Sequence, residues 1–304
     1  MSSAVHKSDA IEFEIFGRRV AGKRWGTVGG HPTFALHGWL DNANSFDRLA
    51  PFLAELDIVA LDFAGHGESD HRPPGVHYHS LTDIQDVIAV ADQLGWKTFG
   101  LIGHSMGAAI SSELAATFPE RVISAVLIDG LLATGGVTQT ELLEQNRSAV
   151  EKMLAAKRAP KKYANVEDMA RRVSQATDQT FEAAIVLVSR GSKLVDGGVT
   201  WRTDPRIRFP TPLRYTRKHI DLLLAQTTAP GLLIVAEQGD NWYQGEIDDA
   251  RQAHPNLTVY RMQGPHHVHL EPAYVAGVAA EIRKFLQLDD VPPSDPMEWD
   301  GQIS

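Results

Sequence analysis

Cysteine is absent from the 304-residue chain, which excludes disulfides, a thiol nucleophile and thiolate-bound metal sites. No apolar run approaches the roughly 20 residues that cross a bilayer, and the first residues lack the apolar core of a secretory signal. Positive charge is in deficit, because the formal net charge is −9 at pH 7. A nucleic-acid binder needs an excess of Lys and Arg. We therefore expect a cytoplasmic protein without a nucleic-acid partner or a membrane span.

What the chain does contain is a hydrophobic content of 43%, enough for a substantial core. Residues 12–16 and 19–25 alternate apolar with polar side chains and predict an opening hairpin. Strand-like and helix-like segments then alternate, which predicts an α/β fold with a mostly parallel sheet flanked by helices. The strand-like segments are 32–37, 57–62, 99–102, 122–129, 231–236 and 257–262.

The alternation is interrupted from about residue 131 to residue 228, where the pattern indicates helices without strands. We interpret this segment as a helical cap domain inserted into a core domain formed by residues 1–130 and 229–288. Residues 289–304 are acidic and rich in proline, and are expected to form a flexible tail.

The pentapeptide Gly103-His104-Ser105-Met106-Gly107 lies between a buried strand and a helix. A serine at the apex of such a turn has its hydroxyl lifted clear of the sheet, and the glycines permit close approach of strand and helix. Ser105 is therefore the candidate nucleophile. The alternative is a serine that merely caps the helix.

A serine nucleophile needs a base, a group that orients the base, and N–H donors for the oxyanion. His266 follows the last strand and is the candidate base, while the N–H groups of Met106 and Trp39 are the candidate oxyanion donors; the Trp39 side chain alone is equally explained by packing. His267 and His269 suggest metal ligands, but zinc sites require three or four ligands and no further ligand motif accompanies them. No cofactor and no metal are expected.

Two carboxylates are candidates for orienting His266. Asp129 ends the strand after the turn helix, whereas Asp240 follows the strand that ends at Ala236. Both would lie at the carboxyl edge of the sheet, so the pattern alone leaves the choice open.

With these residues assembled, the chain resembles the α/β-hydrolase superfamily, and within it the serine hydrolase-like proteins. The resemblance is carried by four stretches in order: His37-Gly-Trp-Leu-Asp-Asn-Ala-Asn-Ser-Phe-Asp-Arg-Leu, Asp62-Phe-Ala-Gly-His-Gly-Glu-Ser, Gly-His-Ser-Met-Gly, and Gly264-Pro-His-His-Val-His-Leu-Glu-Pro. It implies an α/β-hydrolase fold and favours Asp129 over Asp240 as the orienting acid. It also implies that Asp62 and His66 are structural groups that hold the oxyanion loop.

The expected function is that of a cofactor-independent serine hydrolase acting through an acyl-enzyme on esters of small or medium carboxylic acids. The alternatives are a hydrolase of carbon-carbon bonds in diketone-like substrates and a non-catalytic ligand receptor on the same fold. A basic cluster within residues 202–218 suggests either a solvated face or a preference for anionic substrates. The natural substrate and the oligomeric state stay open.

Overall fold

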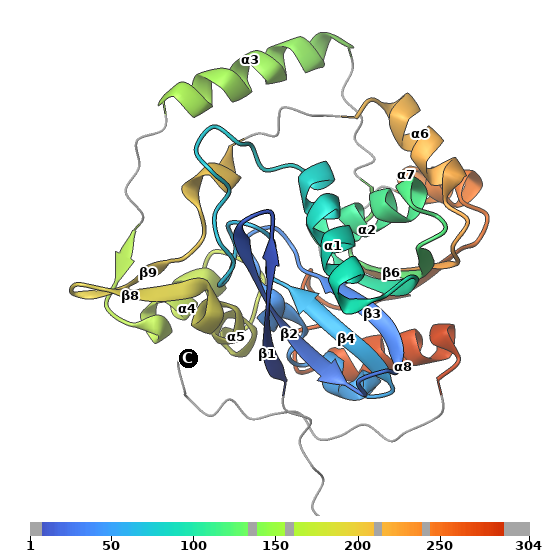
Figure 1. The fold of residues 1–304 in the computed structure, drawn as a ribbon, viewed down its shortest axis with the longest axis horizontal. Helices are drawn as coiled ribbons and strands as arrows, with labels where there is room; N and C mark the ends of the chain where they lie inside the picture. Colours follow the sequence, from blue (N-terminus) through green and yellow to red (C-terminus); the bar gives the residue numbers. More distant parts are fainter. Residues whose placement is uncertain (1–7, 133–138, 156–160, 210–214, 239–243, 289–304) are drawn as a thin grey trace, which may run out of the picture.

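The computed structural model describes residues 8–132, 139–155, 161–209, 215–238 and 244–288. Its centre is an eight-stranded sheet (Figure 1). Along the sheet the strands are β1 (Asp9–Ile15), β2 (Arg18–Gly26), β4 (Leu56–Leu61), β3 (His31–Leu36), β5 (Phe99–His104), β6 (Val122–Ile128), β10 (Gly231–Ala236) and β11 (Leu257–Met262).

Strand directions confirm a mostly parallel sheet with an antiparallel opening hairpin. β2 pairs antiparallel with β1 and with β4. All pairs from β4 to β11 are parallel. The carboxyl ends of β3, β5, β6 and β11 therefore lie at one edge, where the chain continues into the loops that carry the candidate site residues.

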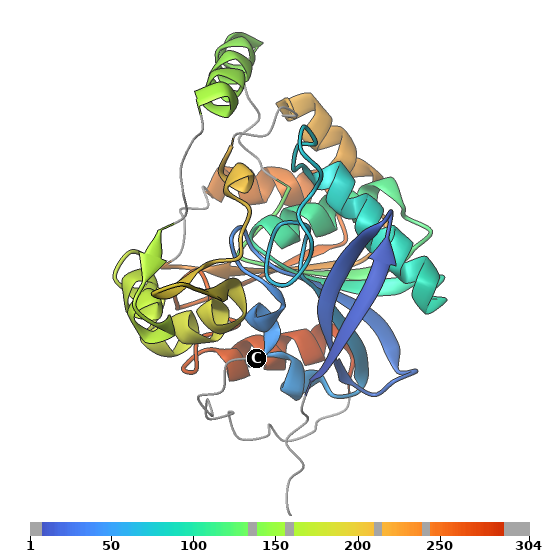
Figure 2. The same ribbon diagram turned by 60° about the vertical axis from the view of Figure 1, so that its left-hand side comes forward.

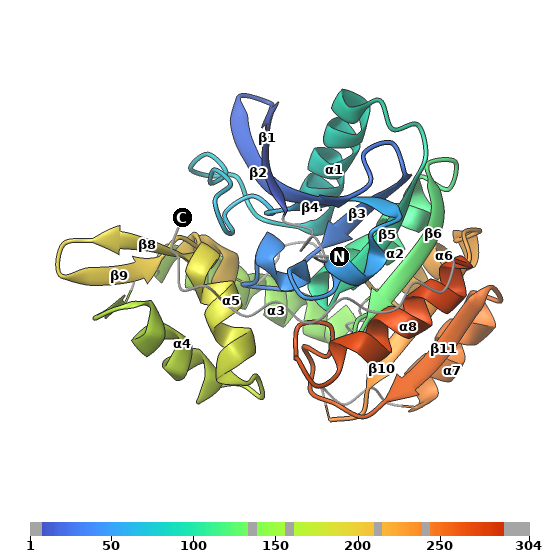
Figure 3. The ribbon, with the colours of Figure 1, turned by 90° about the horizontal axis from the view of Figure 1, so that it is seen from below.

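Helices cover both faces of the sheet (Figure 3). Side chains alternate between faces along a strand, so neighbouring residues such as Leu101 and Ile102 enter different hydrophobic clusters. One cluster includes residues of α1 (Ser80–Leu94), α2 (Met106–Thr117), α6 (Arg217–Gln226) and α7 (Gln244–Ala253). The other includes residues of η1 (Ala43–Phe46), η2 (Ala50–Leu53) and α8 (Val275–Leu286).

The segment inserted between β6 and β10 contains α3 (Gln139–Ala155), α4 (Val166–Ser174), α5 (Phe181–Gly191) and η3 (Pro205–Arg208). It also contains a three-stranded sheet of β7 (Lys162–Tyr163), β9 (Gly198–Trp201) and β8 (Ser192–Val195). The expectation of helices without strands was therefore wrong. The signal was present in the sequence, because Asp196-Gly197 is a favoured two-residue hairpin loop, and Val195 pairs with Gly198 across it.

Helices α4 and α5 and the small sheet lie together beside the central sheet, and α3 stands apart from them (Figure 2). Helices α4 and α5 and the small sheet share a hydrophobic cluster, which also includes Leu270 of the loop after β11. Helix α6 instead packs on α2 and contributes Ile220 and Leu224 to the core, although the sequence placed it in the cap. The tail 289–304 and the alternative acid Asp240 lie outside the described residues.

Among the helices that the structure describes, none combines the length and the apolar character needed to cross a membrane.

Candidate active site

Ser105 stands at the apex of the turn between β5 and α2, with φ 51° and ψ −114°. A non-glycine residue with positive φ is strained, and the surrounding contacts hold it there. The Ser105 N–H donates to the Ile128 carbonyl oxygen at 3.0 Å, and the Ser105 carbonyl oxygen accepts from the N–H groups of Ala108 and Ala109.

The two glycines of the pentapeptide are required by close backbone approach. A Cβ at Gly103 would lie 2.4 Å from the Gly107 carbonyl oxygen, and a Cβ at Gly107 would lie 1.9 Å from the Leu36 carbonyl oxygen. A side chain at either position would therefore push α2 away from β3 and β5. The same contacts bring the start of α2 against the end of β3, which leads into the loop with Trp39.

Asp129 and His266 form the central polar contact of the site. The Oδ2 atom of Asp129 lies 2.5 Å from Nδ1 of His266, and Oδ1 accepts from the Ala236 N–H at 2.9 Å. The Asp129 carboxylate is fully buried, whereas the His266 side chain is 19% exposed. The structure thus pairs His266 with the acid that the resemblance favoured.

Ser105 lies at the same corner as this pair. Gly130 packs so tightly against the turn that a Cβ there would lie 2.7 Å from the Ser105 Cα. The rings of His266 and His104, the residue before Ser105, have centroids 4.6 Å apart. The strand ends therefore bring Ser105, Asp129 and His266 together.

The backbone of His266 is held on both sides. Its N–H donates to Oδ2 of Asp178, a residue of the inserted segment, at 2.9 Å. Its carbonyl oxygen accepts from Nε2 of His104 at 3.1 Å. Thr180, close to Asp178 in the chain, donates its N–H and hydroxyl to the Glu271 carboxylate at 2.9 and 2.6 Å. The inserted segment thus fixes the loop that carries the candidate base.

The candidate oxyanion loop is anchored by His37. Its Nδ1 donates to the Gly38 carbonyl oxygen at 2.8 Å, and its Nε2 accepts from the Phe63 N–H at 3.0 Å. Both contacts suit the neutral ring, and burial lowers the pKa of His37. Within the described part of the chain, the backbone N–H groups of Trp39 and Met106 donate to no other protein group, although the Trp39 indole N–H donates to the Ile207 carbonyl oxygen at 3.4 Å. They are therefore available to a ligand.

Asp62 ties this loop to the inserted segment. Its carboxylate accepts from the Ala43 N–H at 2.7 Å and from Nε of Arg190 on α5 at 2.9 Å. Asp62 and Arg190 are both buried, and Arg190 also pairs with Glu68. His66 packs its ring 5.0 Å from that of His37, and burial lowers the pKa of His66 to about 3. These contacts match the structural role that the resemblance implied for Asp62 and His66.

The basic cluster of the inserted segment is mostly engaged in protein contacts. Arg206 pairs with Asp204, and Arg217 pairs with Asp221 and Asp249. Of the other four members, Arg202 donates to the Ser192 carbonyl oxygen, Lys218 is exposed, Arg214 lies outside the described residues, and Arg208 is described below.

Arg208 differs from the others in its surroundings. Its guanidinium lies 5.7 Å from the centroid of the Trp39 ring, and the side chain is exposed. In the described part of the chain it pairs with no carboxylate. Its charge is therefore available beside the loop that carries a candidate oxyanion donor.

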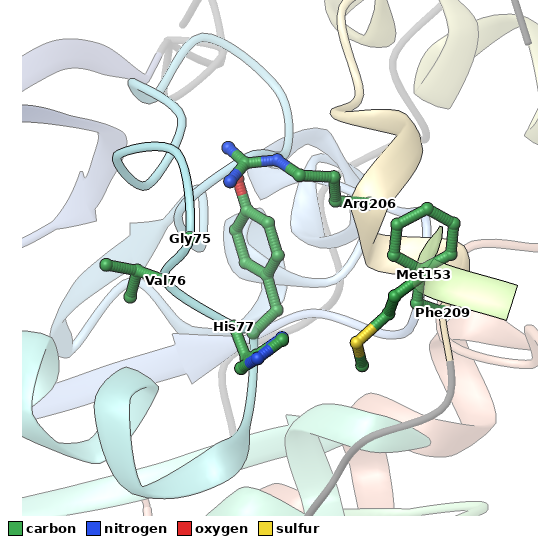
Figure 4. A pocket seen from close by; sticks show the side chains of 7 residues that line it. Gly75, Val76, His77, Met153, Arg206 and Phe209 are labelled. Atoms are coloured by element: carbon green, nitrogen blue, oxygen red, sulfur yellow. The ribbon is translucent and has the colours of Figure 1, made fainter. Parts of the chain in front are cut away.

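A cavity of about 210 Å³ lies beside η3 (Figure 4). Its described lining residues are Gly75, Val76, His77, Tyr78, Met153, Arg206 and Phe209. The Arg206 guanidinium that reaches it is held by Asp204 and by the carbonyl oxygens of Arg72 and Pro73. The candidate catalytic residues do not line this cavity, so we assign no chemistry to it.

Sequence reasoning missed the residues that surround His266 from other loops. Asp178 belongs to the inserted segment, and His104 drew attention only as part of the pentapeptide. Nothing in the local sequence around Asp178 marks it as a partner of a residue 88 positions away.

Comparisons with known proteins agree with the fold described above. A family model described as the alpha/beta hydrolase fold matches residues 34–189. Serine hydrolase-like protein 2 of Homo sapiens is 32% identical over 90% of this chain and 93% of its own length. A serine hydrolase-like protein of Danio rerio is 32% identical, covering 92% of this chain and 87% of its own. The crystal structure of the hypothetical protein PA1622 from Pseudomonas aeruginosa PAO1, at 38% identity, has a TM-score of 0.87 and covers 92% of this chain and 99% of that one.

Proposed function

Because the chain belongs to the α/β-hydrolase fold family, and within it to the serine hydrolase-like proteins, it is a hydrolase, and we propose that it cleaves esters of small or medium carboxylic acids through an acyl-enzyme on Ser105. The observation that carries the proposal is the 2.5 Å contact between Asp129 and His266 beside the strained Ser105 turn. A buried carboxylate that orients an imidazole next to a serine is the arrangement that activates a hydroxyl.

In the first half-reaction, the Ser105 oxygen attacks the ester carbonyl and His266 takes the hydroxyl proton. Since Nδ1 of His266 is bonded to Asp129, Nε2 is the nitrogen that receives it. The negative charge that develops on the carbonyl oxygen is stabilised by the N–H groups of Trp39 and Met106. His266 then returns the proton to the departing alcohol, which leaves Ser105 acylated.

The second half-reaction repeats these steps with water. His266 removes a proton from the water molecule, whose oxygen attacks the acyl carbon, and the same N–H groups stabilise the second oxyanion. Collapse of this intermediate returns the proton to Ser105 and releases the carboxylic acid. Asp129 remains ionised and holds the imidazole in one orientation throughout.

The inserted segment acts in this proposal as a cap whose residues 178–180 hold the histidine loop. Asp178 and Thr180 bond to residues on either side of the loop, so a shift of this segment would displace the base. In this proposal the substrate enters between the cap and the carboxyl edge of the sheet, and the cap limits the substrate to esters of small or medium acids.

The test combines covalent labelling with turnover. We expect a fluorophosphonate probe to label Ser105, and p-nitrophenyl esters of graded chain length to be hydrolysed with a preference for short or medium acids. Ser105→Ala should abolish both. Ser112→Ala is the matched control, because Ser112 lies on α2 and donates to the Ala108 carbonyl oxygen instead of facing the site.

The outcomes separate the alternatives. A folded protein that neither reacts with the probe nor hydrolyses any ester would overturn the proposal in favour of a ligand receptor. Labelling of Ser105 without ester turnover, combined with cleavage of a diketone-like substrate, would instead favour carbon-carbon bond hydrolysis.

A further inference from the structure

Three polar side chains from distant parts of the chain meet in the interior next to the candidate active site. Asp41 follows β3, His104 ends β5, and His267 follows the candidate base. Their exposed fractions are 6%, 1% and 9%. Each offers one potential ligand atom, and the three atoms all lie within 4.8 Å of one another.

The separations of these atoms are unusual for hydrogen bonds. The Oδ2 atom of Asp41 lies 3.4 Å from Nδ1 of His104 and 3.3 Å from Nε2 of His267. Charge-assisted hydrogen bonds are shorter, at about 2.7–2.9 Å. Neighbouring ligands around a tetrahedral zinc ion with bonds of about 2.0–2.2 Å lie roughly 3.3 Å apart. These two separations therefore fit a shared ion better than direct pairing.

The protonation of His104 gives a second, independent observation. Its Nε2 faces the His266 carbonyl oxygen at 3.1 Å, and a carbonyl oxygen can only accept, so Nε2 carries the proton. In the tautomer that carries its proton on Nε2, Nδ1 directs a lone pair at the Asp41 carboxylate, 3.4 Å away. Two electron-rich atoms face each other there, an arrangement that a cation between them relieves.

Other buried atoms near the cluster are also unsatisfied. In the described part of the structure, Nδ1 of His104 and Oε1 of Gln179 are buried without a hydrogen-bond partner. The Gln179 amide nitrogen lies 2.8 and 3.0 Å from the two ring nitrogens of His267. Flipping the Gln179 side-chain amide by about 180° would place its oxygen beside the His267 ring and close to Asp41 and His104. Buried polar atoms normally have hydrogen-bond partners, so these unsatisfied atoms indicate that an ion binds here.

We propose that Oδ2 of Asp41, Nδ1 of His104 and Nε2 of His267 bind one Zn²⁺ ion, with water or Gln179 as the fourth ligand. Two imidazoles, a carboxylate and one further oxygen form a donor set that suits zinc. The contact from His104 to the His266 carbonyl oxygen is the supporting hydrogen bond that a metal-bound imidazole usually makes. The ion ties together the loops that carry Trp39, Ser105 and His266.

The role assigned to the ion is structural, because the cluster faces the interior and the candidate nucleophile does not belong to it. The sequence argument considered only His267 and His269 and did not bring these three residues together, because they belong to three separate loops. Only the fold brings Asp41 to His267, 226 positions away.

The test uses the intact protein stripped of metal by a chelator and titrated with Zn²⁺ alone. We expect one zinc per chain by elemental analysis, a dissociation constant in the micromolar range or below by calorimetry, and a raised melting temperature with zinc. Co²⁺ in place of Zn²⁺ should give the intense visible bands of a tetrahedral site.

Asp41→Asn and His267→Gln should each weaken zinc binding by at least about 100-fold. Removal of a residue that only hydrogen-bonds a metal ligand lowers metal affinity by about 10- to 100-fold, and removal of a ligand should cost at least as much as the upper value. His31→Gln removes an exposed histidine and should leave zinc binding unchanged. Ser105→Ala should also bind zinc normally, which separates this proposal from the catalytic one.

No zinc binding at micromolar concentrations would overturn the proposal, as would binding that survives both ligand substitutions. If the variants do not fold, the visible spectrum of the unaltered protein with Co²⁺ tests the proposal instead. Intense tetrahedral bands support the site, whereas absent bands or the weak bands of octahedral Co²⁺ contradict it. Several weak binding events per chain would indicate adventitious surface histidines and would equally overturn it.

Discussion

Asp129 has a positive φ of 43°, and its carboxylate contacts His266. A non-glycine residue adopts this conformation only when its surroundings enforce it. Here the N–H of Asp129 donates to the Ile234 carbonyl oxygen at 2.7 Å, and Oδ1 is fixed by the Ala236 N–H. The acid is thus positioned by the neighbouring strand β10 before any substrate arrives.

Substitution of the two candidate acids should therefore give very different results. Asp129→Asn should lower kcat by about 10⁴, by analogy with serine proteases, where the same change leaves the imidazole in the wrong tautomer. Asp240→Asn should change kcat little. The measurement is ester hydrolysis by both variants, and the assignment fails if Asp240→Asn is the more damaging change.

Arg208 supports a prediction about substrate charge. Its guanidinium lies over the Trp39 ring, and the backbone N–H of Trp39 is a proposed oxyanion donor. An anionic group on the substrate can therefore reach the Arg208 guanidinium. We expect Arg208→Gln to raise KM for esters that carry a carboxylate by about 10-fold, the effect of one charged hydrogen bond of roughly 1.5 kcal/mol. Matched neutral esters should be unaffected.

Arg217→Gln is the control for that experiment, since Arg217 already pairs with Asp221 and Asp249. Equal effects of both substitutions, or equal effects on neutral and anionic esters, would show that Arg208 belongs to a solvated face.

The sequence predicted that Ser105, Asp129 and His266 lie at one edge of the sheet because each follows a strand closely, and the carboxyl ends of parallel strands lie at the same edge. That inference needs only the order of elements. It could not find the contacts of Asp178 with His266 or of Asp41 with His267, because these depend on how separate loops pack. Residues of this kind carry no local pattern, so only coordinates reveal them.

At the scale of elements, α5 connects the inserted segment to the candidate oxyanion loop. Asn42 and Asn44 donate their side-chain amides to the carbonyl oxygens of Leu187 and Val186, at 2.8 and 3.0 Å. Arg190 adds its buried ion pair with Asp62. A single helix therefore fixes the loop after β3 through neutral and charged contacts, which links the cap to the geometry of the site.

Breaking the ion pair should destabilise the protein strongly. Arg190→Met leaves Asp62 buried without its main charge partner, and removal of one member of a buried pair costs about 3–5 kcal/mol. Arg171→Met is the comparison, because the Arg171–Asp168 pair is exposed and such pairs contribute about 0–1 kcal/mol. Urea unfolding of both variants measures the difference, and similar losses would contradict the buried role of Arg190.

Element prediction succeeded where the hydrophobic pattern was strong and failed where it was short. The buried strands of the central sheet read as apolar runs bounded by turns, as parallel strands should. Strands β8 and β9 have four residues each and stay partly exposed, so their apolar content is low. Their hairpin was indicated only by Asp196-Gly197, a turn signal that a search for helical periodicity overlooks.

At the scale of the whole molecule, the fold encloses several histidines that must stay neutral. Burial is the largest cause of the lowered pKa of His66, at about 3, and it also lowers the pKa of His37. In the unfolded chain a histidine binds a proton below about pH 6.5. Between these two values the unfolded state holds more protons than the folded state, so the free energy of unfolding falls as the pH falls.

We therefore expect the His66 contribution to lower the stability as the pH falls from 6.5 to 5, with a slope that approaches about 1.4 kcal/mol per pH unit well below pH 6.5. His37 contributes in the same direction. Asp83 acts in the opposite direction, because burial raises its pKa to about 7 and the folded state then holds the extra proton. His66→Gln removes only the histidine contribution, so the variant should show a shallower pH dependence than the unaltered protein. The contribution of Asp83 cancels in this comparison.

Urea unfolding at several pH values in this range measures the difference in slope. His31→Gln provides the control, since His31 is exposed and its removal should leave the slope as it was. A His66→Gln variant with the same pH dependence as the unaltered protein would mean that His66 takes up its proton in the folded state. The buried contacts of its ring with His37 would then have to open well above pH 3, and the oxyanion loop would loosen with them.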